Sequence, residues 1–349
     1  MAMTIVEAAR TVTGGVDTHL DVHVAAALDP IGGLLGVESF AATPPAGYRK
    51  LLLWMEAFGA VTKVGVEGTG AYGAGLTRFL RRHDVAVVEV DRQNRQARRQ
   101  RGKSDPLDAI EAARAAQSGR ARGAAKTRDG AVEAIRALLV ARRSARDVRI
   151  KSLNQIRHLS FTGPDCVRAR LKGLSALMLP IEAAALRPRS GTDTVLYATK
   201  LSIQTLGRRV LALEEEAARI DEVLGELVAE VAPSLLALYG VGVISAATLL
   251  VAAGDNPERL RSEAAWAHLC GVAPIEASSG KVVRHRLNRG GDRNANSALW
   301  HIVMVRMVSD PRTRAYVERR TKEGRSKLEI MRMLKRYVAR EVFHHLPRP

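Results

Sequence analysis

Hydrophobic and polar residues alternate near the start of the chain. Between residues 12 and 28 the valines and leucines occupy even positions, whereas Asp17, His19, Asp21 and His23 occupy odd positions. A period of two is typical of a β-strand with one apolar and one polar face. We therefore expect a strand over this segment, and we assign the two histidines to its polar face.

Further strands and helices follow this segment. Pro30 and two glycines predict a turn into a second short strand near residues 37–40, followed by an amphipathic helix over residues 48–58. Apolar runs at residues 61–67 and 85–90 predict two more strands with a helix between them. Strands that alternate with helices favour an α/β sheet with parallel members, in which functional sites gather beyond the strand ends.

The pattern becomes helical after residue 107. It continues to about residue 159, where Gly163 and Pro164 interrupt it, and a seam of apolar residues then repeats with 3-4 spacing. This seam predicts a coiled coil, which either joins protomers, the interpretation that we favour, or packs as a long helix within its own domain. The seam consists of Ile203, Leu206, Val210, Leu213, Ala217, Ile220, Leu224, Leu227 and Val231.

The balance of charged residues indicates which class of molecule the protein binds. The 349 residues include 54 Lys and Arg against 36 Asp and Glu, a formal net charge of +18 that predicts a nucleic-acid partner.

The two cysteines, Cys166 and Cys270, have no metal-ligand spacing, which fits a reducing compartment and excludes a thiolate zinc site. Because the sequence has neither a signal peptide nor an apolar run of about 18 residues, we expect a cytoplasmic protein without a membrane segment.

Four carboxylates are candidate ligands for a divalent cation: Asp17, Glu67, Asp105 and Asp108. Hard cations such as Mg²⁺ prefer oxygen ligands and promote phosphodiester chemistry. Asp17 lies inside a predicted strand, where a buried acid is costly unless it is paired or bound to metal. Asp105 and Asp108 have another interpretation, as the N-cap and a first-turn acid of a helix, and their local sequence favours it. Glu67 also fits an exposed strand end.

Two basic segments adjoin candidate chemistry. Residues 92–103 precede Asp105 and contain no acid, which is typical of a phosphate-binding segment or of a solvated surface. Their cations are Arg92, Arg95, Arg98, Arg99, Arg101 and Lys103.

The second basic segment follows two serines, Ser278 and Ser279, and Gly280. Nearby cations favour a serine nucleophile in phosphoryl transfer. The residues alone favour the alternative, a loop that positions DNA phosphates without reacting. Its cations are Lys281, Arg284, Arg286, Arg289 and Arg293. The histidines have no zinc-ligand spacing, so no metal-binding histidine is expected.

The chain resembles the DEDD transposases of bacterial insertion sequences, which include relatives of the pilin-gene invertases and the RNA-guided bridge recombinases. The resemblance extends from about Gly14 to the basic tail. Four segments carry it in the family order: GVDTHLDVHVAAALD, VEGTGAYG, VEVDRQNRQARRQRGKSDPLDA and GVAPIEASSGKVVRHRLNRGGDRNANSAL.

The resemblance implies a fold that is α/β plus all-α. It implies a ribonuclease-H/Holliday-resolvase-like catalytic domain over residues 1–127, a helical coiled-coil region over residues 128–232, and a helical transposase domain with a serine motif over residues 233–349. It also implies an insertion-sequence transposase, a site-specific recombinase that acts on double-stranded DNA of the element ends and target. A structured guide RNA and a homo-oligomer, a dimer or a tetramer, are further expected partners.

The resemblance also assigns roles to residues. The four family acids fall on Asp17, Glu67, Asp105 and Asp108, which are expected to hold Mg²⁺ or Mn²⁺, and the Ser-x-Gly element falls on Ser278, with Ser279 and Gly280 next to it. Leu20 stands where many relatives have a lysine. Two other functions remain open: a metal-dependent junction-resolving endonuclease, in which the serine only binds, and a non-enzymatic DNA-bridging protein.

Overall fold

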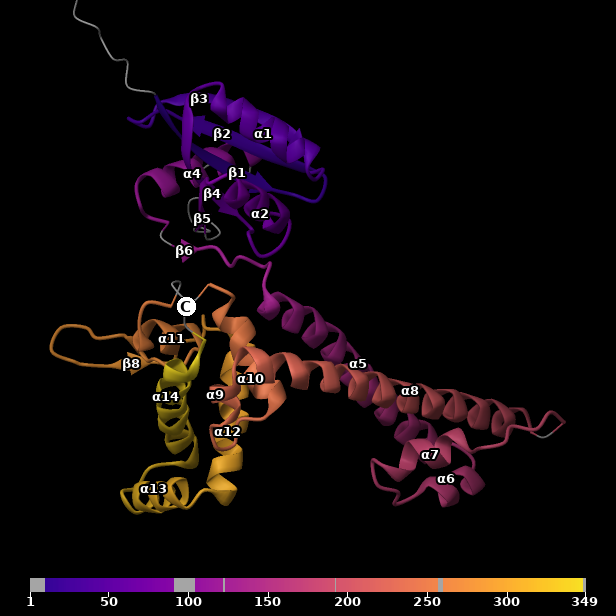
Figure 1. Cartoon of the computed structure of the whole chain (residues 1–349). Coiled ribbons are helices and arrows are strands. Elements are labelled where there is room, and N and C mark those ends of the chain that lie inside the picture. The colour runs from indigo at the N-terminus through magenta and orange to yellow at the C-terminus, as the bar shows by residue number, and fades with distance from the viewer. Residues whose placement is uncertain (1–9, 91–103, 122, 192, 257–259, 348–349) are drawn as a thin grey trace, which may run out of the picture. The chain divides into compact units, whose positions relative to one another are not determined.

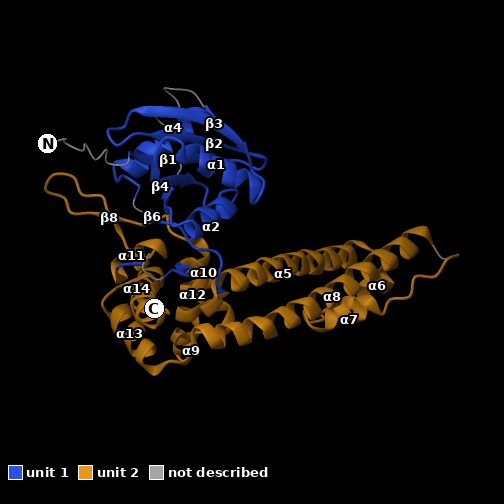
Figure 2. Cartoon of the chain, turned by 45° about the horizontal axis from the view of Figure 1, so that its top comes forward, with its two compact units in different colours: residues 1–130, 253–261 blue, residues 131–252, 262–349 orange. Residues whose placement is uncertain are grey.

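The structure is a computed structural model that describes residues 10–90, 104–121, 123–191, 193–256 and 260–347. The chain divides into two compact units (Figure 2). The first consists of residues 1–130 and 253–261, and the second of residues 131–252 and 262–349. The first unit is a mixed α/β structure and the second is mainly helical, so the expected fold class is confirmed in outline.

A six-stranded sheet forms the centre of the first unit (Figure 1). Its strands are β1 (Thr11–Thr18), β2 (Val22–Leu28), β3 (Leu34–Ala41), β4 (Ala60–Glu67), β5 (Ala86–Val90) and β6 (Gly123–Ala124). They lie in the order β3-β2-β1-β4-β5-β6. β1, β2 and β3 are antiparallel neighbours, β4 and β5 run parallel to β1, and β6 is antiparallel to β5. The mixed sheet fits the ribonuclease-H-like domain that the resemblance implies.

The hairpin of β1 and β2 corrects the expectation of one strand over residues 12–28. The chain turns between Thr18 and Val22, and the backbone N–H of His19 donates to the carbonyl of Val22 at 3.1 Å. Because Val22 lies an even number of positions after Thr18, the apolar residues of both strands occupy even positions. The alternation therefore continues through the turn and gives no sign of it. The assignment of His23 to a polar face is also wrong, since this residue is buried.

Helices cover both faces of the sheet. α1 (Ala46–Glu56) and α2 (Ala74–Arg82) contribute to an apolar core with Val16 and Val66 on one face. α4 (Asp105–Gln117) covers the other face, where a Cβ atom at Gly15 or Gly65 would overlap the α4 backbone. These two glycines therefore allow α4 to lie directly on β1 and β4.

The second unit is built from helices and one short hairpin. Its helices are α5 (Ala131–Thr162), α6 (Asp165–Leu171), α7 (Met178–Ala184), α8 (Thr194–Val231), α9 (Pro233–Leu236), α10 (Val243–Ala253), α11 (Glu263–Leu269), α12 (Arg293–Ser309), α13 (Pro311–Lys322) and α14 (Lys327–His345). β7 (Ile275–Glu276) and β8 (His285–Arg286) form the hairpin. Among the helices that the structure describes, none is long and apolar enough to cross a membrane.

The apolar seam of α8 packs against α5 of the same chain. The two helices form a long pair, with α6 and α7 packed near one end (Figure 1). Ile203 and Val210 share a buried core with Ile156 of α5. Polar contacts extend the pairing, since Arg149 on α5 donates to Glu214 on α8 at 2.7 Å. At these positions the seam therefore packs against a helix of the same chain. Its role in joining protomers stays a prediction.

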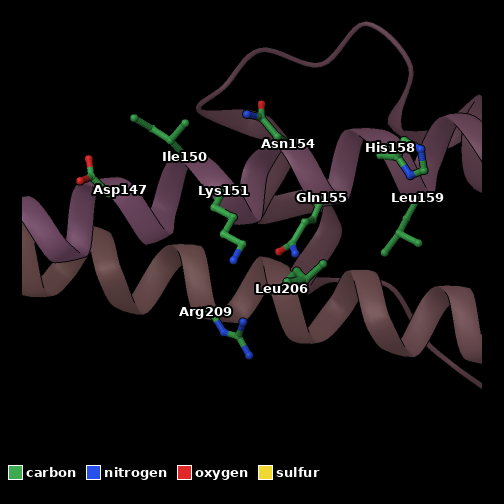
Figure 3. Close-up of a pocket in the computed structure, with 9 residues that line it drawn as sticks. All are labelled: Asp147, Ile150, Lys151, Asn154, Gln155, His158, Leu159, Leu206 and Arg209. Carbon is green, nitrogen blue, oxygen red and sulfur yellow. The ribbon is translucent and has the colours of Figure 1, made fainter.

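A recess of about 770 Å³ lies along this helix pair. Figure 3 shows Lys151, Gln155 and Leu159 extending from α5 toward α8, where Leu206 lies. None of the residues expected to carry chemistry lines this recess. The candidate chemistry therefore lies elsewhere, in the sheet of the first unit and in the β7–β8 hairpin of the second.

Candidate active site

Asp17 and Glu67 occupy the ends of neighbouring strands. Val16 of β1 pairs with Val66 of β4 in the parallel ladder, so Asp17 and Glu67 are next in register. The hydroxyl of Thr18 donates to the Glu67 carbonyl at 2.7 Å, which holds the two strand ends together. Because side chains alternate along a strand, the two carboxylates face the same side as Gly15 and Gly65, the side that α4 covers.

The first turn of α4 brings two more acids to this side of the sheet. The helix begins at Asp105, with Ser104 as its N-cap residue, and Asp108 lies within the first turn. Asp105 is therefore not the N-cap, so the capping interpretation of this residue is wrong. Asp108 is buried and Asp105 is partly exposed. The close packing of α4 on β1 explains how acids remote in sequence converge.

His19 joins Asp17 and Asp105. Its Nε2 atom lies 3.1 Å from Oδ2 of Asp17 and 3.6 Å from Oδ1 of Asp105. These three residues offer metal-ligand atoms that all lie within 4.8 Å of one another. Glu67 and Asp108 do not belong to that group of three. The sequence-based expectation excluded a metal-binding histidine, and the only signal for His19 was its position two residues after Asp17.

Burial and charge act together on Asp17. Burial is the largest influence and raises the pKa of the Asp17 carboxyl. The nearby His19 lowers that pKa, whereas repulsion from Asp108 and Asp105 raises it further. Crowded carboxylates disfavour their own ionised forms, and a bound cation relieves that repulsion. The electrostatics of the site thus suit a divalent cation.

The serine motif lies in the β7–β8 hairpin of the second unit. The Ser278 hydroxyl accepts a hydrogen bond from the backbone N–H of Arg284 at 3.2 Å, across the hairpin. Ser279 lies nearer the tip, where its backbone pairs with Val282. Gly280 has a φ of 56°, a left-handed conformation that glycine adopts without strain. Both serines are exposed, and among the described residues the Ser279 hydroxyl has no hydrogen-bond partner.

The cations of the serine segment are exposed around this hairpin, as a phosphate-binding surface requires. They are Lys281, Arg284, Arg286, Arg289 and Arg293. The other predicted basic segment lies outside the described residues. Its members are Arg92, Arg95, Arg98, Arg99, Arg101 and Lys103.

Fold and site together define a protein with a mixed α/β unit that carries an acidic cluster and a helical unit that carries a basic serine hairpin. Residues 14–161 match the DEDD model of IS110, described as a transposase. Residues 232–318 match the model described as the transposase IS116/IS110/IS902 family. The chain is therefore similar to this family of transposases over two separate stretches.

Two insertion-element proteins are similar to part of the chain. The IS110 uncharacterized 43.6 kDa protein of Streptomyces coelicolor is 27% identical over 158 residues, which are 44% of this chain and 37% of that protein. The IS900 uncharacterized 42 kDa protein of Mycobacterium paratuberculosis is 26% identical over 162 residues, 45% of this chain and 41% of the relative. The matched part spans about two-fifths of the length of these relatives.

Proposed function

We propose that this protein is an insertion-sequence transposase, a site-specific DNA recombinase that exchanges strands by phosphoryl transfer. The observation that carries the proposal is the convergence of Asp17, His19 and Asp105 beside the first turn of α4. The similarity to transposase families supports it, and so does a net charge of +18, which suits a polyanionic substrate.

The proposed metal ligands are the four acids, Asp17, Glu67, Asp105 and Asp108, with His19 as an additional nitrogen ligand. A bound Mg²⁺ or Mn²⁺ ion supplies charge neutralisation at a scissile phosphate. The protein contributes the position of each ligand, because β1, β4 and α4 are packed without intervening side chains at Gly15 and Gly65. A site preorganised in this way holds the phosphate without reorganisation during the reaction.

The proposed nucleophile is Ser278, with Ser279 as its neighbouring alternative. The serine oxygen bonds to phosphorus while the bond from phosphorus to the leaving deoxyribose oxygen breaks, and that oxygen takes up a proton as the serine loses one. A hydroxyl of another strand reverses the step and releases the serine. The ester retains the energy of the phosphodiester, so strand exchange requires no nucleotide cofactor. The cations Lys281 and Arg284 are exposed in the same hairpin, and in this proposal they bind the phosphate.

The substrate in this proposal is double-stranded DNA of the element ends and of the target. The family resemblance extends the proposal to a structured guide RNA and to a homo-oligomer. A non-enzymatic DNA-bridging protein fits less well, because it has no need of a buried Asp17 crowded by two further acids.

A metal-dependent nuclease is the second candidate function. Ser278 is engaged by the backbone of Arg284, which also suits a serine that only binds phosphate. In that case water attacks the phosphodiester, the products are hydrolysed ends and no strand is rejoined.

The test of the proposal is strand exchange on element-end DNA with Asp17→Asn and Asp105→Asn. We expect both variants to lose divalent-ion-dependent recombination while their thermal unfolding stays close to wild type, because removing mutually repelling carboxylates seldom unfolds a domain. Asp21→Asn is the matched control, since Asp21 is exposed in the adjacent turn. Full recombination by either variant removes that carboxylate from the site.

A further inference from the structure

A recess of about 930 Å³ lies within the second unit. Residues of α12 and α14 line it, together with chain segments 271–274 and 287–291. The two segments cross closely, since a Cβ atom at Gly291 would overlap the backbone of Gly271. The Asn288 side chain also donates to the carbonyl of His268 at 2.9 Å. The crossing places the recess at the base of the serine hairpin, and its volume is that of a ligand-binding pocket.

The recess is strongly basic. Its lining contains six cations and, among the described residues, no carboxylate: Arg289, Arg293, Arg332, Lys335, Arg336 and Arg340. Glu263 of α11 pairs with two of them, Arg336 and Arg340. Lys335 donates to Asn296 at 2.8 Å, and burial together with Arg332 lowers the pKa of its ammonium group. Such crowding of positive charge favours the binding of an anion.

Three of these arginines remain available to an anion. Among the described residues, no carboxylate lies within ion-pair distance of Arg289, Arg293 or Arg332. An arginine side chain presents several donors in a planar fork, which suits phosphate oxygens. The recess thus offers phosphate-binding groups that the fold itself does not use.

Two aromatic side chains line the same recess. Trp300 of α12 is 41% exposed and Tyr337 of α14 is 49% exposed, although both are large rings. Tyr337 packs edge-on against Tyr316, with ring centroids 5.8 Å apart and an interplanar angle of 84°. Exposed aromatic rings beside a set of cations are typical of surfaces that stack nucleic-acid bases.

We propose that this recess binds unpaired nucleotides of a nucleic acid, with bases against Trp300 and Tyr337 and phosphates on Arg289, Arg293 and Arg332. Within a duplex, neighbouring base pairs cover the faces of each base, so a recessed ring reaches a base only where the strand is unpaired. The inference rests on the proposed function in one respect, that the partner is a nucleic acid. It adds that this unit distinguishes single strands from duplex.

The test compares full-length protein with Trp300→Leu in fluorescence anisotropy titrations. The probes are an oligothymidine, an oligouridine of the same length and a duplex DNA of that length. Stacking accounts for about 1–3 kcal/mol per base, so we expect single-strand affinity to fall by about 5- to 150-fold while duplex affinity changes little. The two single-stranded probes decide whether the nucleotides belong to DNA or to RNA.

Three further variants keep the test decisive. Tyr239→Leu is the matched control, because Tyr239 is 53% exposed in the same unit and does not line the recess. It should bind every probe as wild type does. Trp300→Phe retains a ring and should recover most of the single-strand affinity. If Trp300→Leu unfolds, Tyr337→Leu is measured instead, with the same expectation.

Two results with Trp300→Leu would overturn the inference. One is single-strand binding that Trp300→Leu leaves unchanged, and the other is an equal loss for single strand and duplex. Failure of this site is distinguishable from failure of the proposed function. If wild type binds duplex but neither single strand, only the recess is wrongly assigned, whereas if it binds no probe, the nucleic-acid partner itself is refuted.

Discussion

Replacement of His19 by glutamine tests the metal group of the first unit. The Nε2 atom of His19 lies 3.1 Å from Asp17 and 3.6 Å from Asp105. Ligands at neighbouring corners of an octahedral ion, each about 2.1 Å from it, lie about 3 Å apart. The distances from His19 to the two acids are therefore close to the spacing of neighbouring ligands of one ion, and glutamine cannot supply the imidazole nitrogen.

The expected loss of affinity follows from this geometry. Removal of a residue that only supports a ligand already weakens metal binding by about 10- to 100-fold. We expect His19→Gln to weaken Mn²⁺ binding by at least about 10-fold, which corresponds to about 1.4 kcal/mol. Mg²⁺ binding should weaken less, because this ion prefers oxygen ligands and depends mainly on the carboxylates.

Electron paramagnetic resonance measures the Mn²⁺ affinity and also identifies a nitrogen ligand of the bound ion. The signal of free Mn²⁺ gives the affinity, and pulsed experiments on bound Mn²⁺ detect a directly bonded nitrogen. The wild type should show nitrogen coupling that His19→Gln abolishes and that His83→Gln, at an exposed histidine of the same unit, retains. Equal affinity and retained coupling in His19→Gln would refute the assignment of this ligand, while Mn²⁺ binding that survives Asp17→Asn unchanged would refute the metal site.

Three other perturbations test the packing. Glutamate at Leu213 and Ile220 should reduce the oligomer mass in light scattering. An unchanged mass in folded variants would mean that the seam packs only against α5 of its own chain. Gly15→Ala should destabilise the protein by about 1–3 kcal/mol in denaturant titrations and weaken Mn²⁺ binding, because the added methyl group overlaps α4. Gly225→Ala is the control, since a Cβ atom at Gly225 meets open space, and it should cause neither effect. Ile156→Ala should lower the free energy of unfolding by about 2–5 kcal/mol, since this side chain is fully buried; a smaller loss would mean that the α5–α8 core is loosely packed.

Local patterns predicted the framework of the site. The apolar runs at residues 61–67 and 85–90 correspond to β4 and β5, and the amphipathic segment at 48–58 corresponds to α1. Asp17 stood out because an acid within a strand needs a partner, and the structure places acids and a histidine around it. These features follow from short-range periodicity, which the sequence displays directly.

Other features depend on contacts between segments that are far apart in the sequence. The turn at His19 was hidden because alternation continues through it, so the approach of His19 to Asp105 had no local signature. A heptad seam does not reveal which helix it meets, and here it packs on α5. Trp300 and Tyr337 lie on different helices, and only their packing places both rings on one basic recess.

The central claim is that a serine of the hairpin attacks DNA. Its most direct test is to trap protein on a nicked element-end substrate under denaturing conditions and to map the modified peptide. We predict an adduct on Ser278 in the wild type, its loss in Ser278→Ala, its retention in Ser279→Ala and little adduct in Glu67→Gln, because the acids position the scissile phosphate. A map to Ser279 would move the nucleophile by one residue, and efficient strand exchange by the double alanine variant without any adduct would contradict the serine mechanism.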